Sequence, residues 1–145
     1  MKASDIMTSN PACCIPETNA QDAARLMEQN DCGSLPVVQD RDSMRLSGMV
    51  TDRDLALRVL GRGQGPETQV EQAMTKNVAS VNPDASLDEV ESVMSGQQVR
   101  RVPVVDQHGA VVGMIAQADL AREQGAVGKK DFGRVLERIS EPAGR

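Results

Sequence analysis

A threonine hydroxyl and an aspartate carboxylate stand three residues apart, at Thr51 and Asp54, where an apolar strand pattern changes to a helical one. A hydroxyl beside the free N–H groups of a helix start suits a phosphate oxygen, and a carboxylate one turn further can accept hydrogen bonds from the vicinal hydroxyls of a ribose. The same residues also fit an ordinary helix cap, in which Thr51 or Asp52 satisfies the first helical amides and the helix dipole favours Asp54. This segment alone leaves ligand binding and capping both open.

The chain contains the same unit twice. Matching residues lie 67 positions apart in Met7 and Met74 (74 − 7), Pro16 and Pro83 (83 − 16), and Pro36 and Pro103 (103 − 36). Further on, the segment 48–55 matches 113–120 at an offset of 65 (113 − 48), so the first copy carries two additional residues and a hairpin loop is expected at Asp40 to Arg45. Because a unit of about 60 residues buries only a small core alone, we expect the two copies to pack together with pseudo-twofold symmetry.

Each copy is predicted to fold as β-α-β-β-α, which gives an α/β fold class for the tandem repeat. Two helix starts carry capping boxes, Thr18-x-x-Gln21 and Ser86-x-x-Glu89. The elements expected in the first copy are strands at 12–15, 35–38 and 46–51 and helices at 18–29 and 52–60. Those expected in the second copy are strands at 78–81, 102–105 and 111–116, a helix from 86 and a helix at 117–124.

The predicted domains are a first copy at 1–60, a glycine-rich linker at 61–67, a second copy at 68–125, and a C-terminal amphipathic helix and tail at 126–145. The glycines and proline of the linker cannot continue a helix, and they lack the order and the lysine of a phosphate-binding loop. The C-terminal helix has one apolar stripe, made by Phe132, Val135, Leu136 and Ile139. That stripe packs on its own domain pair, or it contacts a second copy or a client protein.

Composition excludes several classes of function. A net charge of −5 and a single Phe, with no Trp or Tyr, disfavour nucleic acid binding. No apolar run approaches the roughly 18 residues that a membrane span requires, and the N-terminus lacks a secretory signal. We therefore expect a cytoplasmic protein without a membrane partner.

The sequence offers no metal-binding or catalytic pattern. His108 is the only histidine and lies in a turn sequence, and the three cysteines do not have metal-ligand spacing. No pair of nucleophile and base can be assembled, so we expect no catalytic residues and no metal. Cys13, Cys14 and Cys32 are interpreted as small buried hydrophobes, with a Cys14–Cys32 disulfide as the alternative.

The repeat and the segment Gly48-Met-Val-Thr51-Asp-Arg-Asp54-Leu55 together resemble the CBS domain family, whose members occur in tandem pairs with a Gly-h-h-Thr/Ser-x-x-Asp/Asn-h motif at this position. The paired Met-Thr segments and the Val/Leu-Pro-Val-Val strands extend the resemblance over residues 1 to 124. It implies a small stand-alone regulatory module of bacterial type, a Bateman module, rather than an enzyme. The implied ligand is AMP, ADP or ATP, as in energy sensing, with S-adenosylmethionine or NAD as further candidates and no cofactor required.

The resemblance also implies which residues contact the ligand. Asp54 would hold the ribose hydroxyls and Thr51 the phosphate. Arg100 and Arg101 of the other copy would bind the phosphates through their planar guanidinium groups, with a solvated strand end as the alternative interpretation of these two residues. The adenine would lie against the strand near Ala79 and Val81.

The second cleft departs from the family pattern. Ala116 replaces the hydroxyl, and Gly33 and Ser34 stand where the first cleft has its two arginines, whereas Asp119 remains. Ala12, the counterpart of Ala79, would complete this cleft. We expect it to be weak or empty: Asp119 holds the ribose of a ligand with little charge, or it is only a helix N-terminal carboxylate.

The alternative function is a structural scaffold with an unused ligand motif. Paired CBS domains associate as dimers through their helices, and the apolar residues of the candidate dimer face are Leu55, Leu57, Val59 and Leu120. In either case the resemblance implies a homodimer and a client protein that is met in trans.

Overall fold

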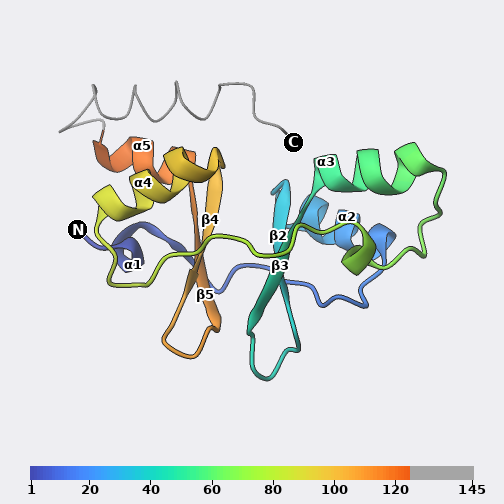
Figure 1. The fold of residues 1–145 in the computed structure, drawn as a ribbon, viewed down its shortest axis with the longest axis horizontal. Coiled ribbons are helices and arrows are strands. Elements are labelled where there is room, and N and C mark those ends of the chain that lie inside the picture. The colour runs from blue at the N-terminus through green and yellow to red at the C-terminus, as the bar shows by residue number, and fades with distance from the viewer. Residues whose placement is uncertain (125–145) are drawn as a thin grey trace. The chain divides into compact units, whose positions relative to one another are not determined.

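The computed structural model describes residues 1–124, which form an α/β fold (Figure 1). The chain divides into two compact units. The first unit comprises Met1–Asn10, Ala79–Gln107 and the described residues from Val112 onward, and the second comprises Pro11–Val78 with His108–Val111. The predicted α/β class is confirmed. The predicted stripe from Phe132 to Ile139 lies outside the described residues.

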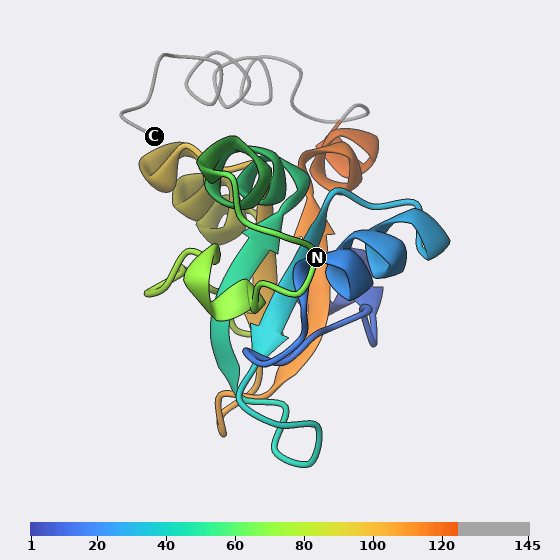
Figure 2. The same cartoon turned by 90° about the vertical axis from the view of Figure 1, so that its right-hand side faces the viewer.

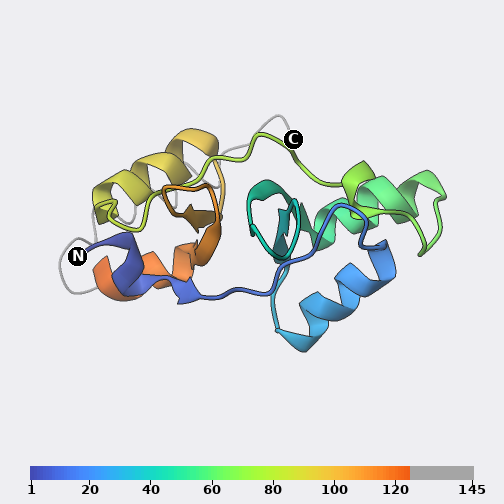
Figure 3. The same ribbon diagram turned by 90° about the horizontal axis from the view of Figure 1, so that it is seen from below.

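The first unit contains a sheet with the strand order β1-β5-β4, made of β1 (Thr8–Ser9), β4 (Arg101–Val105) and β5 (Val111–Ala116). Its helices are α1 (Ala3–Ile6), α4 (Leu87–Gln97) and α5 (Gln117–Gln124). Figure 3 shows α1 beside α5, which it contacts. The capping serine predicted for α4 is confirmed, because the Glu89 N–H donates to Ser86 Oγ at 3.2 Å. The core is aliphatic and includes Ile6, Val90, Met94, Val102, Val104, Ile115 and Leu120.

The second unit is built on an antiparallel hairpin of β2 (Ser34–Val38) and β3 (Leu46–Thr51). The predicted loop between them is confirmed and extends from the hairpin in Figure 2. The helical segments are α2 (Ala20–Gln29), the short α3 (Asp52–Asp54), the π-helical turn η1 (Leu55–Val59), and the 3-10 turns η2 (Leu60–Arg62) and η3 (Val70–Gln72). The main core cluster consists of Cys14, Ala23, Met27, Leu35, Val37, Val50, Val70 and Met74.

Three local predictions need correction. The helix expected from Thr18 is capped instead by Asn19, whose side chain accepts from the Asp22 N–H at 2.8 Å, while Thr18 Oγ1 accepts from the Ile15 N–H. The strands expected at 12–15 and 78–81 are reduced to isolated bridges. The helix expected at 52–60 is helical throughout but changes from α to π geometry after Asp54.

The leading segment of each copy, residues 2–9 in the first and 69–75 in the second, pairs with the other copy. Thr8 pairs with Met114 in β5, and Thr75 forms the matching bridge to Met49 in β3. The bridge between Lys2 and Ser86 likewise has a counterpart between Gln69 and Asn19. Each unit therefore combines the body of one copy with the leading segment of the other, and the units do not coincide with the sequence repeats.

The cysteines are free thiols. Cys14 is fully buried and Cys13 nearly so, as the interpretation as small hydrophobes predicts, and the alternative Cys14–Cys32 disulfide is not formed. Burial, reinforced by the neighbouring Cys13, raises the pKa of the Cys14 thiol to about 12, against an opposing effect of Arg41. The folded protein therefore holds Cys14 as the neutral thiol at physiological pH.

This raised pKa predicts a pH-dependent stability. The contribution of Cys14 is fully present below its ordinary pKa of 9.0, and it is lost as the pH rises toward about 12, because the unfolded chain releases the proton first. The expected slope is about 1.4 kcal/mol per pH unit at most. Urea unfolding at about pH 8 and about pH 10 measures it. Cys14→Ala should flatten the slope and the half-buried control Cys32→Ala should not; equal slopes in all three proteins would refute the assignment.

Candidate functional site

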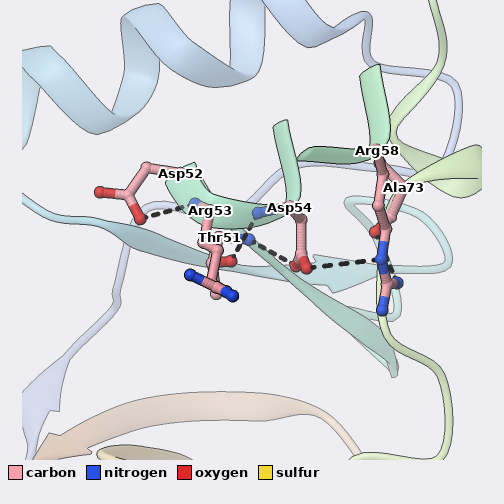
Figure 4. Close-up of polar contacts among 6 residues, drawn as sticks. All are labelled: Thr51, Asp52, Arg53, Asp54, Arg58 and Ala73. Carbon is pink, nitrogen blue, oxygen red and sulfur yellow. Dashed lines mark hydrogen bonds and ion pairs between the residues drawn. The ribbon is translucent and has the colours of Figure 1, made fainter. Parts of the chain in front are cut away.

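The strand-to-helix junction at Thr51 is closed by a reciprocal pair of hydrogen bonds. The Asp54 N–H donates to Thr51 Oγ1 and the Thr51 N–H donates to Asp54 Oδ2, each at 3.0 Å (Figure 4). This is a capping box with Thr51 as the N-cap, so the capping role that the sequence left open is real and belongs to Thr51 rather than Asp52. The hydroxyl of Thr51 keeps its own proton for a further hydrogen bond.

The second oxygen of the Asp54 carboxylate faces a cation. Asp54 is only 4% exposed, and its Oδ1 lies 3.9 Å from Arg58 Nε. Arg58 Nη1 also donates to the Ala73 carbonyl at 3.1 Å, which holds the guanidinium in place (Figure 4). A buried carboxylate needs such compensation. Oδ1 is thus the carboxylate oxygen that lies outside the capping box, and a ligand contact at this oxygen stays a prediction.

Sequence reasoning missed Arg58. Its signal was present, because Arg58 follows Asp54 by four positions, a spacing at which opposite charges meet on one helix face. The π-helical turn η1, which separates the two residues, has no comparable sequence signal. Such turns are rare and often lie at functional sites.

The second copy repeats the carboxylate but not the hydroxyl. The Ala116 N–H donates to Asp119 Oδ2 at 2.7 Å, and Arg122 pairs with Asp119 Oδ1. Asp119 therefore lies in the first turn of α5 with a cation beside it, and its role in a second cleft stays a prediction. Without a side-chain oxygen, Ala116 offers a ligand only its backbone.

Backbone hydrogen bonds show which residues lie next to each strand-to-helix junction. The Asp52 N–H donates to the Gly33 carbonyl at 2.9 Å, and the equivalent Gln117 N–H donates to the Arg100 carbonyl at 2.8 Å. Gly33 and its neighbour Ser34 thus lie beside the Thr51 junction. Arg100, by contrast, lies beside the Ala116 junction of its own copy.

The residues predicted for the first cleft are divided between the two units. Thr51 and Asp54 belong to the second unit, whereas Ala79, Val81, Arg100 and Arg101 belong to the first. Both arginines are exposed, Ala79 is half-buried, and Val81 is a core residue that bridges to Val104. Ala12 is half-buried in the second unit, apart from its predicted partners Ala116 and Asp119 in the first. A shared cleft between these groups stays a prediction.

Residues 1–124 show no metal cluster and no membrane span. No cluster of three or more His, Cys, Asp or Glu side chains that could hold a metal ion occurs in this range. His108 lies exposed in the turn between β4 and β5. None of the described helices combines the length and apolar character that crossing a membrane requires.

Solved structures share this fold. Hypoxic response protein I, with two coordinated zinc ions, is 36% identical with a TM-score of 0.77, and the match covers 84% of this chain and 98% of that one. The CBS domain pair of protein MJ0100, in complex with 5-methylthioadenosine and S-adenosylmethionine, is 28% identical with a TM-score of 0.77 over 87% and 97% of the two chains. CBSX2 of Arabidopsis thaliana, in complex with AMP, is 26% identical with a TM-score of 0.73 over 88% and 98%.

The sequence comparisons agree with the structural ones. The CBS domain-containing protein YhcV of Bacillus subtilis (strain 168) is 39% identical over 136 residues, which are 94% of this chain and 93% of the relative. The family model for the CBS domain matches twice, at residues 3–61 and 70–126. These two matches cover both copies of the repeat and both strand-to-helix junctions, so the chain belongs to the CBS domain family.

Proposed function

We propose that this protein is a regulatory module that binds an adenosine-containing ligand at the Thr51–Asp54 junction and signals to a partner protein. The observation that carries the proposal is the state of the Asp54 carboxylate: one oxygen is fixed by the cap, and the other lies outside the cap, 3.9 Å from Arg58 Nε. A carboxylate held in this way is prepared to accept the two hydroxyls of a ribose without first reorganising. The AMP of CBSX2 and the S-adenosylmethionine of MJ0100 support the ligand class.

The ligand proposed first is AMP, ADP or ATP, with phosphate groups reaching Arg100 and Arg101. S-adenosylmethionine and NAD are the further candidates. The expectation that no cofactor is required finds no support in the neighbours, since hypoxic response protein I coordinates two zinc ions. The proposal also includes three expectations from the sequence: that the module regulates a client protein, that it senses the energy state, and that it is cytoplasmic.

A thermal shift panel tests the proposal. The protein is refolded free of carried-over ligand and melted with AMP, ADP, ATP, NAD, S-adenosylmethionine or GMP. A ligand at about a hundredfold excess over its Kd stabilises the folded state by about 2.7 kcal/mol, which raises the Tm by about 5 to 10 °C for a chain of this size. We expect this rise with an adenine compound and not with GMP. No rise with any adenine compound would overturn the proposal.

One observation favours the scaffold as a second candidate function. Leu57 is 52% exposed and Leu60 is 76% exposed, and they lie three residues apart on consecutive turns. Exposed leucines at this spacing fit a helix face that meets a partner. The dimer face expected from the sequence needs correction, however, because Val59 and Leu120 are buried within their own units and only Leu57 of the four is largely exposed.

A further inference from the structure

Arg58 contacts both the Asp54 carboxylate and a segment of the other copy. Its Nε lies 3.9 Å from Asp54 Oδ1, and its Nη1 donates to the Ala73 carbonyl at 3.1 Å (Figure 4). Asp54 follows β3 in the first copy, whereas Ala73 belongs to the leading segment of the second copy, residues 69–75. One guanidinium therefore connects residues of both copies within the second unit.

The leading segment 69–75 is fixed to the second unit near both of its ends. The Val70 N–H donates to a carbonyl that precedes α2 and the Thr75 N–H donates to a carbonyl of β3, each at 2.8 Å. Arg58 adds a side-chain hydrogen bond between these two points, at Ala73. Because amides in such bonds exchange with solvent only when the segment opens, their exchange rate measures how firmly the segment is docked.

The negative charge of Asp54 needs a cation with or without a ligand. Asp54 is buried, and a buried carboxylate depends on a nearby positive charge. The ribose hydroxyls of the proposed ligand are neutral, so they can donate to the carboxylate without cancelling its charge. In the proposed complex the ligand also excludes water from the Arg58 side chain, which is 42% exposed, and the attraction between the two charges grows as the local dielectric constant falls.

We infer that Arg58 couples ligand binding at Asp54 to the docking of the leading segment 69–75; this inference rests on the proposed function. Since the same guanidinium bonds to Ala73, a stronger hold of Asp54 on Arg58 also fixes the segment more firmly. Such coupling is reciprocal, so opening of the segment weakens ligand binding by the same factor. Occupation of the first junction is thereby transmitted to the segment with which the second copy begins.

The second junction differs at the equivalent position. The counterpart of Arg58 is Glu123 (58 + 65), and Asp119 pairs instead with Arg122, three positions along α5. The Arg122 side chain is 73% exposed, and within residues 1–124 its hydrogen-bonding and ionic partner is Asp119. Arg122 thus compensates a carboxylate without a bond to a leading segment. The coupling is specific to the first junction, and Arg122 provides the matched control.

Hydrogen exchange of the full chain, measured by mass spectrometry with and without saturating AMP, tests the inference. Ligand binding stabilises the whole chain, so exchange in residues 69–75 is compared with exchange in α2 of the same unit. In the wild type, AMP should slow exchange in 69–75 by about tenfold more than in α2. Arg58→Met removes the charge and the donor and should abolish this additional slowing. The control Arg122→Met should behave as the wild type does.

Arg58→Lys separates the charge from the bridge. An ammonium group supplies the charge but lacks the planar fork of a guanidinium, so this variant should bind AMP and still lose the additional slowing. It also tests the inference if Arg58→Met does not fold. Additional slowing that persists in Arg58→Lys would show that the charge alone is sufficient and would overturn the bridge. Loss of AMP binding in folded Arg58→Lys would assign Arg58 to binding itself, which also overturns the coupling.

The failure of the inference can be distinguished from the failure of the proposed function. If AMP binds the wild type and slows exchange in 69–75 no more than in α2, the inference fails and the proposed function stands. The same holds if Arg58→Met retains the additional slowing. If AMP does not bind the wild type, the ligand proposed first is wrong and the inference fails with it.

Discussion

Asp54→Asn is expected to weaken binding of the adenine nucleotide by about 100-fold or more. The carboxylate accepts two hydrogen bonds from the ribose in the proposed complex, and bonds to a charged acceptor contribute about 1.5 kcal/mol each at the low end. Their loss corresponds to roughly 3 kcal/mol, or about two factors of ten in Kd. The asparagine oxygen can still accept the Thr51 N–H, which in the wild type lies 3.0 Å from Asp54 Oδ2, so the cap and the fold should persist.

Titration calorimetry measures this change, and a circular dichroism melt verifies that the variant is folded. Asp119→Asn is the matched control, because Asp119 accepts the Ala116 N–H in the same geometry. We expect the control to retain high-affinity binding. The reverse outcome, with binding lost in Asp119→Asn and kept in Asp54→Asn, would move the site to the junction beside Arg100. Binding that survives both substitutions would exclude both junctions.

The largest loss of stability is expected from Leu120→Ala. Leu120 is fully buried in the core of the first unit, where it packs with Ile6, Val102 and Ile115. Truncating such a leucine removes transfer free energy and leaves a cavity, at a cost of about 2 to 5 kcal/mol. That is a large share of the 5 to 15 kcal/mol that typically separates folded from unfolded domains. Urea unfolding followed by circular dichroism measures the difference.

Leu57→Ala is the matched control, since both leucines were candidates for one dimer face but Leu57 is 52% exposed. We expect its free energy of unfolding to stay within about 0.5 kcal/mol of the wild type. A cost for Leu57→Ala as large as that for Leu120→Ala would contradict the exposure of Leu57. If that cost grew with protein concentration, a second copy of the chain would cover this side chain in solution.

The sequence predicted the loop and the helix cap correctly where the signal was local or occurred in both copies. The two-residue slip between the copies located the β2–β3 loop, and Ser86 caps its helix as the capping box predicts. Thr18 failed as a cap because Asn19 stands next to it and is the stronger N-cap residue. The π geometry of η1 could not be predicted from the sequence, because over a single turn the same apolar pattern is compatible with an α-helix and with a π-helix.

The candidate site was predictable only in part. The motif identified Thr51 and Asp54, and the structure adds that they bond to each other. The sequence drew attention to Ser34 only because it stands in the place of an arginine, whereas its position opposite Thr51 and its unsatisfied oxygen depend on strand register and packing. The motif also carries no information on which copy a leading segment joins, so the exchange between copies could not be foreseen.

That exchange has a consequence for the order in which the protein folds during synthesis. Thr8 pairs with Met114, which leaves the ribosome 106 residues later (114 − 8), whereas all of Pro11–Val78 is made early. Chains are made from the N-terminus, and contacts distant in sequence form late. The larger part of the second unit can therefore assemble while translation continues, and His108–Val111 join it later. Lys2 can pair with Ser86 before β5 is made, but β1 has no strand to join until β5 emerges, and a chain that stops before β5 would leave β1 without its partner.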